Sequence, residues 1–172
     1  MSTQWWTDAA DPLKRKLARD PYWKNHQAEL RGPTGLHLGV FTGPYLDLIL
    51  QGEKTIESRF GVQRCAPHGR VAVGDILLLK AASGPIRGVC RIAETWFFDL
   101  TRTPLSDVRR RFGAAICAVD DAFWVERADA RLVTLMRVER AIPISPVHVA
   151  KKDRRGWVTL REQAPLFATA RA

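Results

Sequence analysis

The sequence predicts an α+β protein that is mostly β, a small and partly open β-barrel with short peripheral helices. Short runs rich in Val, Ile, Leu and aromatic residues recur between Gly, Pro and Asp, which is typical of strands joined by turns. The helix-like segments are few and do not alternate regularly with the strands, as a parallel sheet would require. With 172 residues, 46% hydrophobic and 26% charged, the chain has enough material for one domain with its own core.

The chain is expected to divide into a helical arm, a main domain and a short tail, at residues 1–34, 35–162 and 163–172. Asp20-Pro21 favours a turn or a helix start, and Gly32-Pro33 closes the arm. Basic and apolar residues alternate within the arm, which predicts one or two short helices with a basic outer face. Three indoles either pack the arm onto the main domain or stack on bases: Trp5, Trp6 and Trp23.

The main domain is expected to begin with a strand, a helix and a second strand. The apolar, β-branched run 36–41 is typical of a buried strand. Pro44 suits the first position of a helix and Gly52 its end, with apolar residues along one side between them. A strand at 54–60 follows, and its alternation places neighbouring residues on opposite faces of the sheet.

The rest of the domain is expected to add further strands and two helices. Apolar runs predict strands at 71–79, around a Gly-Asp turn, and at 86–98, 131–144 and 158–160. Helices are predicted at 103–113 and 119–129. These elements suit a small barrel, because the strands outnumber the helices and follow one another directly.

The balance of charge predicts a polyanionic partner. There are 27 Lys and Arg residues against 18 Asp and Glu, a net charge of +9, and residues 101–172 hold 14 of the basic residues against 8 acidic ones. No stretch is apolar enough to span a membrane, and the first ten residues lack a signal-peptide pattern, so we expect a cytoplasmic protein. The three cysteines form no Cys-x-x-Cys pair, so no metal-site motif is found. Cofactor and oligomeric state are left open.

The densest group of unlike polar residues follows the predicted first helix, in the segment Gly52-Glu53-Lys54-Thr55-Ile56-Glu57-Ser58-Arg59. Two cations beside a carboxylate can hold a phosphate or polarise a carbonyl while the carboxylate handles a proton. On an ideal strand Glu57 and Arg59 share a face, whereas Lys54 joins them only if the turn redirects it. The alternative is a structural ion network on an edge strand. The sequence therefore names Lys54, Glu57 and Arg59 as candidate catalytic residues.

The spacing Gly52-x-Lys54-x-x-Glu57-x-Arg59 resembles the signature of the ASCH domain, in the PUA-like superfamily, and the resemblance covers about residues 36–160. It implies a PUA-like β-barrel with a cleft lined by these side chains, and binding of RNA or another nucleic acid. Some members are ribonucleases on single-stranded RNA. A smaller group are amidohydrolases on cytidine acylated at its exocyclic amine, but they have Thr at the position of Glu57, and Thr55 is the nearest hydroxyl here.

Three functional hypotheses follow. The first is an RNA-binding protein that cleaves single-stranded RNA, with Glu57 as general base and a divalent metal as an optional cofactor. The second is an amidohydrolase on a modified nucleoside, with a desolvated Lys54 as base. The third is a non-catalytic reader of a modified base, which would stack on one of four aromatic residues: Tyr45, Trp96, Phe97 or Trp124.

Two further sets of residues are assigned by charge alone. Asp120 or Asp121 would add a carboxylate to the cleft unless, as is commoner, they start a helix. A basic segment near the end of the domain would grip phosphates, with Trp157 behind it, unless it is only a solvated loop. With single-stranded RNA as the expected partner, the predicted nucleic-acid-binding residues are Tyr45, Lys54, Arg59, Lys151, Lys152, Arg154 and Arg155.

Overall fold

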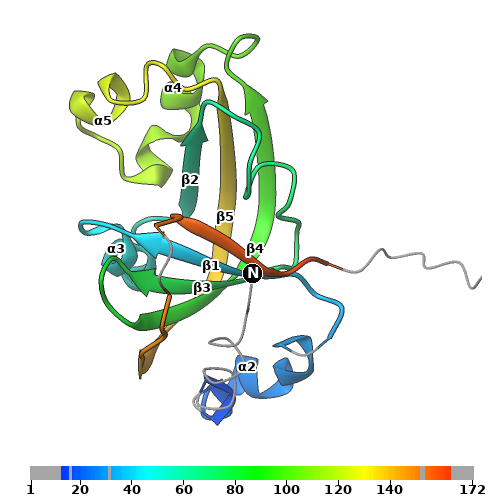
Figure 1. Cartoon of the computed structure of the whole chain (residues 1–172). Helices are drawn as coiled ribbons and strands as arrows, with labels where there is room; N and C mark the ends of the chain where they lie inside the picture. The colour runs from blue at the N-terminus through cyan, green and yellow to red at the C-terminus, as the bar shows by residue number, and fades with distance from the viewer. Residues whose placement is uncertain (1–12, 16, 31, 152–153, 164–172) are drawn as a thin grey trace, which may run out of the picture.

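A mixed six-stranded sheet dominates the computed structural model, which describes residues 13–15, 17–30, 32–151 and 154–163. Its strands are β1 (Leu36–Phe41), β2 (Ile56–Gly61), β3 (Ile76–Ala81), β4 (Ile86–Asp99), β5 (Leu132–Val147) and β6 (Trp157–Arg161). The order is β2-β5-β4-β3-β1-β6, and every neighbouring pair is antiparallel except β1 and β3. The sheet curls into a half-barrel with β2 and β6 at its edges, which confirms the predicted mostly-β, partly open barrel (Figure 1).

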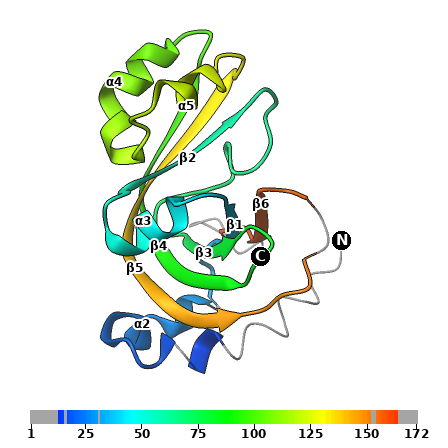
Figure 2. The same ribbon diagram turned by 90° about the vertical axis from the view of Figure 1, so that its left-hand side faces the viewer.

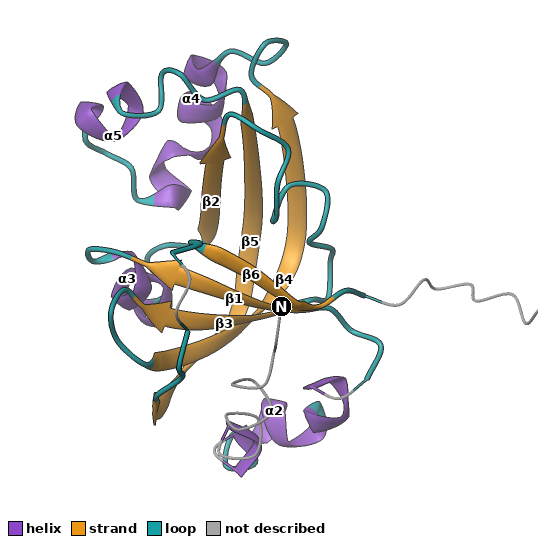
Figure 3. Cartoon of the chain, viewed as in Figure 1, coloured by secondary structure: helices purple, strands orange, loops and turns teal. Residues whose placement is uncertain are grey.

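Short helices surround the sheet. Those described are α2 (Pro21–Asn25), a 3-10 helix (Gln27–Leu30), α3 (Tyr45–Gln51), α4 (Leu105–Ile116) and α5 (Asp121–Val125). Helices α4 and α5 lie at one end of the sheet and α2 at the other (Figure 2), and strands outweigh helices throughout (Figure 3). None of the described helices has the length and apolar character needed to cross a membrane.

The strand β3 lies inside the sheet and is buried on both faces. Ile76 and Leu78 pack into a cluster with the arm, whereas Leu77 and Leu79 face a second cluster under α3. A strand covered on both faces needs apolar residues at every position rather than at alternate ones, which explains the uninterrupted Ile-Leu-Leu-Leu run. A third cluster packs α4 and α5 onto the outer face of β2 and β5.

Several predicted boundaries differ from the structure; the helix predicted at 119–129, for example, is limited to α5, Asp121–Val125. Residues 71–73 form no strand, because the Asp75 carboxylate accepts a hydrogen bond from the Ala72 N–H (2.7 Å) and holds a turn there. Helix α4 runs past Gly113 because Ile116, one turn further, is fully buried. Pro44 caps α3 rather than occupying its first position, whereas Gly52 ends the helix as predicted, with a φ of +79° that favours glycine.

The N-terminal arm shares the core of the sheet. Leu13, Leu17 and Trp23 are at most 1% exposed and pack in the cluster that covers β1 and β3. The indole N–H of Trp23 donates to the Arg140 carbonyl at 3.2 Å. Trp23 therefore packs the arm onto the domain and offers no face to a base, while Trp5 and Trp6 lie outside the described residues.

Candidate functional site

The turn between α3 and β2 places Lys54 beside the sheet. Lys54 precedes the first residue of β2, so strand alternation does not fix its side chain, and its N–H donates to the Leu48 carbonyl at 3.0 Å. Its Nζ donates to the Ile56 and Ile116 carbonyls at 2.9 Å each, and the residue is 2% exposed. The turn thus redirects the ammonium group toward the strand face that carries Glu57.

Lys54, Glu57 and Arg59 converge. Lys54 Nζ lies 3.5 Å from Glu57 Oε2, and Arg59 Nε lies 2.7 Å from Glu57 Oε1. The Arg59 contact is an ion pair without an aligned hydrogen bond at Nε. The carboxylate is nearly buried, with a cation at each oxygen. The arrangement is an ion network, and all three residues also line a cavity.

Burial governs the ionisation of Lys54. Removal from water lowers the pKa of the amine below its usual 10.5, and the nearby positive charge of Arg59 adds to this, while the Glu57 carboxylate opposes it without cancelling it. The ammonium also lies 5.2 Å from the centre of the Tyr45 ring. Lys54 therefore releases its proton at a lower pH than an exposed lysine does.

Arg59 bridges the two edges of the half-barrel. Its terminal nitrogens donate to the Gly156 carbonyl at 3.0 Å, just before β6, and to the Val40 carbonyl at 3.1 Å, in β1. The guanidinium also lies over the rings of Phe41 and Trp157, 5.0 and 5.4 Å from their centres. Since β2 and β6 are the edge strands, we call the gap between them the seam, and Arg59 spans it.

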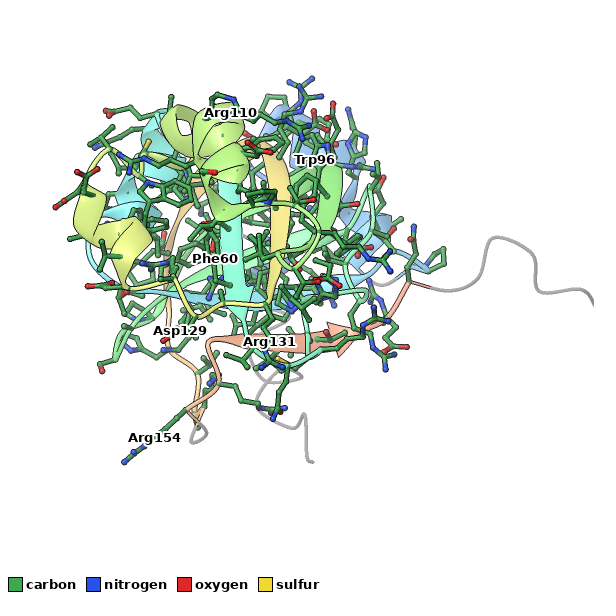
Figure 4. All side chains as sticks on the ribbon, turned by 90° about the horizontal axis from the view of Figure 1, so that it is seen from above. Phe60, Trp96, Arg110, Asp129, Arg131 and Arg154 are labelled. Atoms are coloured by element: carbon green, nitrogen blue, oxygen red, sulfur yellow. The ribbon has the colours of Figure 1, made fainter. Side chains whose placement is uncertain are left out.

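A cavity of about 460 Å³ lies on one side of this bridge. Lys54, Glu57, Arg59 and Tyr45 form part of its wall. Phe41 of β1 and Phe60 of β2 also line it, and the helix and loop after α4 add four more charged or aromatic residues: Phe123, Glu126, Arg127 and Asp129. Figure 4 labels two of these lining residues, Phe60 on β2 and Asp129 near it. A cavity of this size is in the range of small-ligand sites.

The residues around α5 were missed by the sequence analysis. Arg127 lies 3.6 Å over the Phe123 ring, donates to the Phe123 carbonyl at 2.6 Å, and pairs with Glu126 at 3.2 Å. They follow the signature by more than sixty positions and form no motif. The available signal was the pairing of an Arg with an aromatic residue four positions earlier on a predicted helix.

The predicted alternatives for carboxylates and hydroxyls can be placed as well. Asp120 accepts from the Ala122 N–H at 2.9 Å and caps α5, and Asp121 pairs with Arg109, so both act at the helix start. Neither lines the cavity, and Thr55 is exposed outside it. The hydroxyl residues that do line it are Thr42 and Ser58.

The four aromatic residues predicted to stack on a base also differ in whether they line the cavity. Tyr45 lines the cavity. Trp124 is 4% exposed and its indole donates to the Ala118 carbonyl, Trp96 packs on Phe112, and Phe97 is 40% exposed beside His68. Tyr45 is thus the one member of the predicted set that a ligand in this cavity can reach.

The basic segment lies beside the cavity rather than in its wall. Lys151 Nζ donates to the Arg155 carbonyl at 2.8 Å. Arg154 is exposed and extends away from the ribbon (Figure 4). Gly156 follows directly and accepts from Arg59, so the segment ends at the seam. Lys152 lies outside the described residues. In the described ranges no group of three His, Cys, Asp or Glu side chains is placed to hold a metal ion.

The architecture is a mostly-β, partly open barrel with short helices around it. More narrowly, the chain has the fold of ASCH from Zymomonas mobilis, with a TM-score of 0.58 and 13% identity over 73% of this chain and 87% of that one. A tyrosine-to-phenylalanine variant of the same protein gives 0.58 at 13% identity over 73% and 90% of the two chains. A serine-to-alanine variant gives 0.53 at 15% over 66% and 73%. No family model and no curated protein matches the sequence. The ASCH fold implied by the signature is thereby confirmed.

Proposed function

We propose that this protein binds single-stranded RNA and cleaves it at the Lys54–Glu57 pair. The observation that carries the proposal is a buried amine and carboxylate, 3.5 Å apart, facing a cavity of about 460 Å³. Buried charges with shifted pKa values in a cleft are typical of catalytic sites. The signature, the fold and the net charge of +9 support a nucleic-acid partner.

Binding would use rings and cations on both walls of the cavity. Tyr45 and Phe123 stand edge to face, 6.2 Å apart, so a base can stack on one ring while the other closes the end of the pocket. Arg127 lies on the far wall and is 28% exposed at its side chain, so it is placed for a phosphate. Arg59 contacts Glu57 and also donates hydrogen bonds across the seam. Its main role is therefore to position Glu57.

Cleavage would begin with proton transfer from a ribose 2′-hydroxyl. The Glu57 carboxylate takes that proton, the oxygen attacks the adjacent phosphorus, and the bond to the 5′-oxygen breaks, leaving a 2′,3′-cyclic phosphate. Once the 2′-proton has neutralised Glu57, the third N–H of Lys54 turns from that carboxyl group to the leaving 5′-oxygen and protonates it. Glu57 then returns its proton to the Lys54 amine, so both side chains regain their starting charge. A lowered lysine pKa makes the transfer to the 5′-oxygen easier near neutral pH.

The test is binding and cleavage of a labelled single-stranded RNA, followed by fluorescence anisotropy and by denaturing gel. The wild type should bind at low salt and cleave, and Glu57→Gln should bind without cleaving. Reactions with EDTA and with Mg²⁺ determine whether a metal is needed. No binding at low salt together with no cleavage under either condition would contradict the proposal, and binding alone would indicate a non-catalytic reader.

A second candidate is the amidohydrolase on acylated cytidine. The lowered pKa of Lys54 in a cavity of nucleoside size favours it, and the Ser58 and Thr42 hydroxyls line that cavity. Glu57 counts against it, because that position is Thr in the amidohydrolases that the sequence resembles. Chromatography of acylated cytidine after incubation with the wild type and Lys54→Ala decides between the two enzymes.

A further inference from the structure

Three hollows follow one another along the seam. The first is the cavity at Lys54, and the second, of about 210 Å³, shares Arg59, Phe60 and Gly61 with it. The third, of about 420 Å³, shares four residues with the second: Cys65, Ala66, Gly156 and Trp157. The hollows therefore form a continuous row, the seam groove, in which Arg59 is a ridge between the first and second members.

The chemistry changes along the seam groove. The middle hollow offers neutral polar groups, with His68 Nδ1 3.1 Å from the Thr134 hydroxyl, and burial together with Arg64 lowers the pKa of His68. The far hollow carries two guanidinium groups, Arg70 and Arg155, and Glu162 is the one acidic residue among its described lining. A ligand that reaches this end therefore meets two guanidinium groups.

The ion pair at the far end is easily exchanged. Arg70 contacts Glu162 at 2.8 Å, but the two side chains are 59% and 63% exposed. Exposed pairs of this kind contribute little to stability, because water screens them and the side chains lose entropy in pairing. A phosphate can therefore recruit Arg70 with little loss of folding stability, and a bidentate contact with phosphate is the stronger of the two.

We propose that a single-stranded polynucleotide lies along the seam groove, with one base in the first hollow and a backbone phosphate at Arg70 and Arg155. The inference rests on the proposed function and adds a second subsite, which a polymer reaches and a single nucleoside does not. A nucleoside fills the first hollow and ends at the Arg59 ridge. Only a chain that continues past the ridge uses the positive charge beyond it.

The experiment compares two double variants that each remove two positive charges. Arg70→Ser with Arg155→Ser alters the groove. Arg87→Ser with Arg110→Ser is the matched control, because both control arginines lie in exposed ion pairs, with Asp47 and Asp107, and Arg110 lies far from Arg154 in the view of Figure 4. Anisotropy of fluorescein-labelled octauridylate and diuridylate is measured on ice in EDTA over a salt series, and gels confirm that the RNA stays intact.

The groove variant should bind octauridylate several-fold more weakly than the wild type, with a salt slope smaller by about 0.7, since the proposed contact is to one phosphate and each phosphate contact on a single strand contributes about 0.7. Diuridylate, which ends near the ridge, should bind both proteins alike, and the control should match the wild type. Equal losses in the two double variants, or equal losses for the two RNAs, overturn the inference while leaving the proposed function intact. A wild type that binds neither RNA refutes the proposed function itself.

Discussion

Two buried contacts between a basic and an acidic side chain can be compared among the described residues, and they differ in what surrounds them. Lys54 and Glu57 are 3.5 Å apart with side chains 2% and 5% exposed, and they line a cavity. His37 and Asp75 are 2.9 Å apart with both side chains at 0% exposure. The first pair can meet a ligand, whereas the second is enclosed by the core.

The enclosed pair acts on the backbone. Asp75 accepts from the N–H groups of Gly35 and Ala72 at 2.9 and 2.7 Å, in addition to His37 Nε2. It thereby fixes the entry to β1 and the turn before β3. The comparison teaches that burial of ionisable groups is not itself a sign of function: the pair that lines the cavity is open to a ligand there, whereas the enclosed pair holds two loops together.

The largest expected effect comes from Lys54→Met. Cleavage of single-stranded RNA should fall by at least about 100-fold, the usual contribution of a positioned acid or base. The free energy of unfolding should fall by about 2–4 kcal/mol, because the Ile56 and Ile116 carbonyls lose their donor. Gel-based rates and urea unfolding measure the two effects.

Lys80→Met is the matched control for that variant. Lys80 is also buried, at 7% exposure, its pKa is also lowered by burial, and its Nζ donates to the Ala81 carbonyl at 3.1 Å, but it does not line the cavity. The Lys80→Met variant should cleave RNA at a rate within about twofold of the wild type. A Lys80→Met rate as low as that of Lys54→Met would remove the distinction between a lysine at the cavity and a lysine in the core.

A change in the enclosed pair should lower folding stability without lowering the cleavage rate. Asp75→Asn leaves one oxygen where the carboxylate used two, so at least one backbone N–H loses its partner and the free energy of unfolding should drop by about 1–3 kcal/mol. The cleavage rate of the folded protein should not change. Thermal melts and rates measured well below the melting temperature test this, and a selective loss of rate would mean that the enclosed pair reaches the site after all.

The pH dependence of stability sharpens the same comparison. The pKa of Lys54 is lowered in the folded state, so the unfolded chain binds more protons between that value and 10.5, and folding stability rises with pH across this window. Lys54→Met lacks this contribution. Unfolding in urea at a series of alkaline pH values should show the wild type gaining stability relative to the variant, and a constant difference would show that Lys54 ionises as it would in water.

The smallest effect is expected from the basic segment. Replacement of its four cations by Ser should weaken RNA binding and reduce the salt slope by up to about 2.8, from about 0.7 per phosphate. The turnover rate with saturating RNA should stay the same, because the described members of the segment, Lys151, Arg154 and Arg155, do not line the cavity. Binding isotherms at several salt concentrations check this, and unchanged affinity would mean that the segment is only a solvated loop. The residues concerned are Lys151, Lys152, Arg154 and Arg155.

The sequence predicted the parts of the site that lie close together along the chain. Lys54, Glu57 and Arg59 share one turn and one strand, so local geometry decides their positions, although the redirection of Lys54 depended on carbonyls from β2 and α4. Phe123 and Arg127 could not be predicted, because their place in the cavity follows from how α5 packs against the outer face of β2.

The strands could also be predicted from local sequence patterns. Their boundaries were harder to predict. The run 36–41 matches β1 residue for residue, since burial on both faces leaves a continuous apolar pattern. The segment 71–73 has the same pattern, yet Val73 is 57% exposed in a turn that the Asp75 side chain holds. Such a side-chain contact to the backbone overrides β propensity and leaves no trace in periodicity.

The arm and the last strand meet on the same side of β1. Arg161, at the end of β6, donates to the carbonyls of Glu29, Leu30 and Thr34 at 2.8 Å. During synthesis the arm leaves the ribosome early, whereas Arg161 emerges late. The arm therefore lacks its hydrogen bonds to Arg161 for most of the synthesis of the chain. Folding of this protein should be completed late, after β6 is released, and should be slow for its size because its contacts join distant segments.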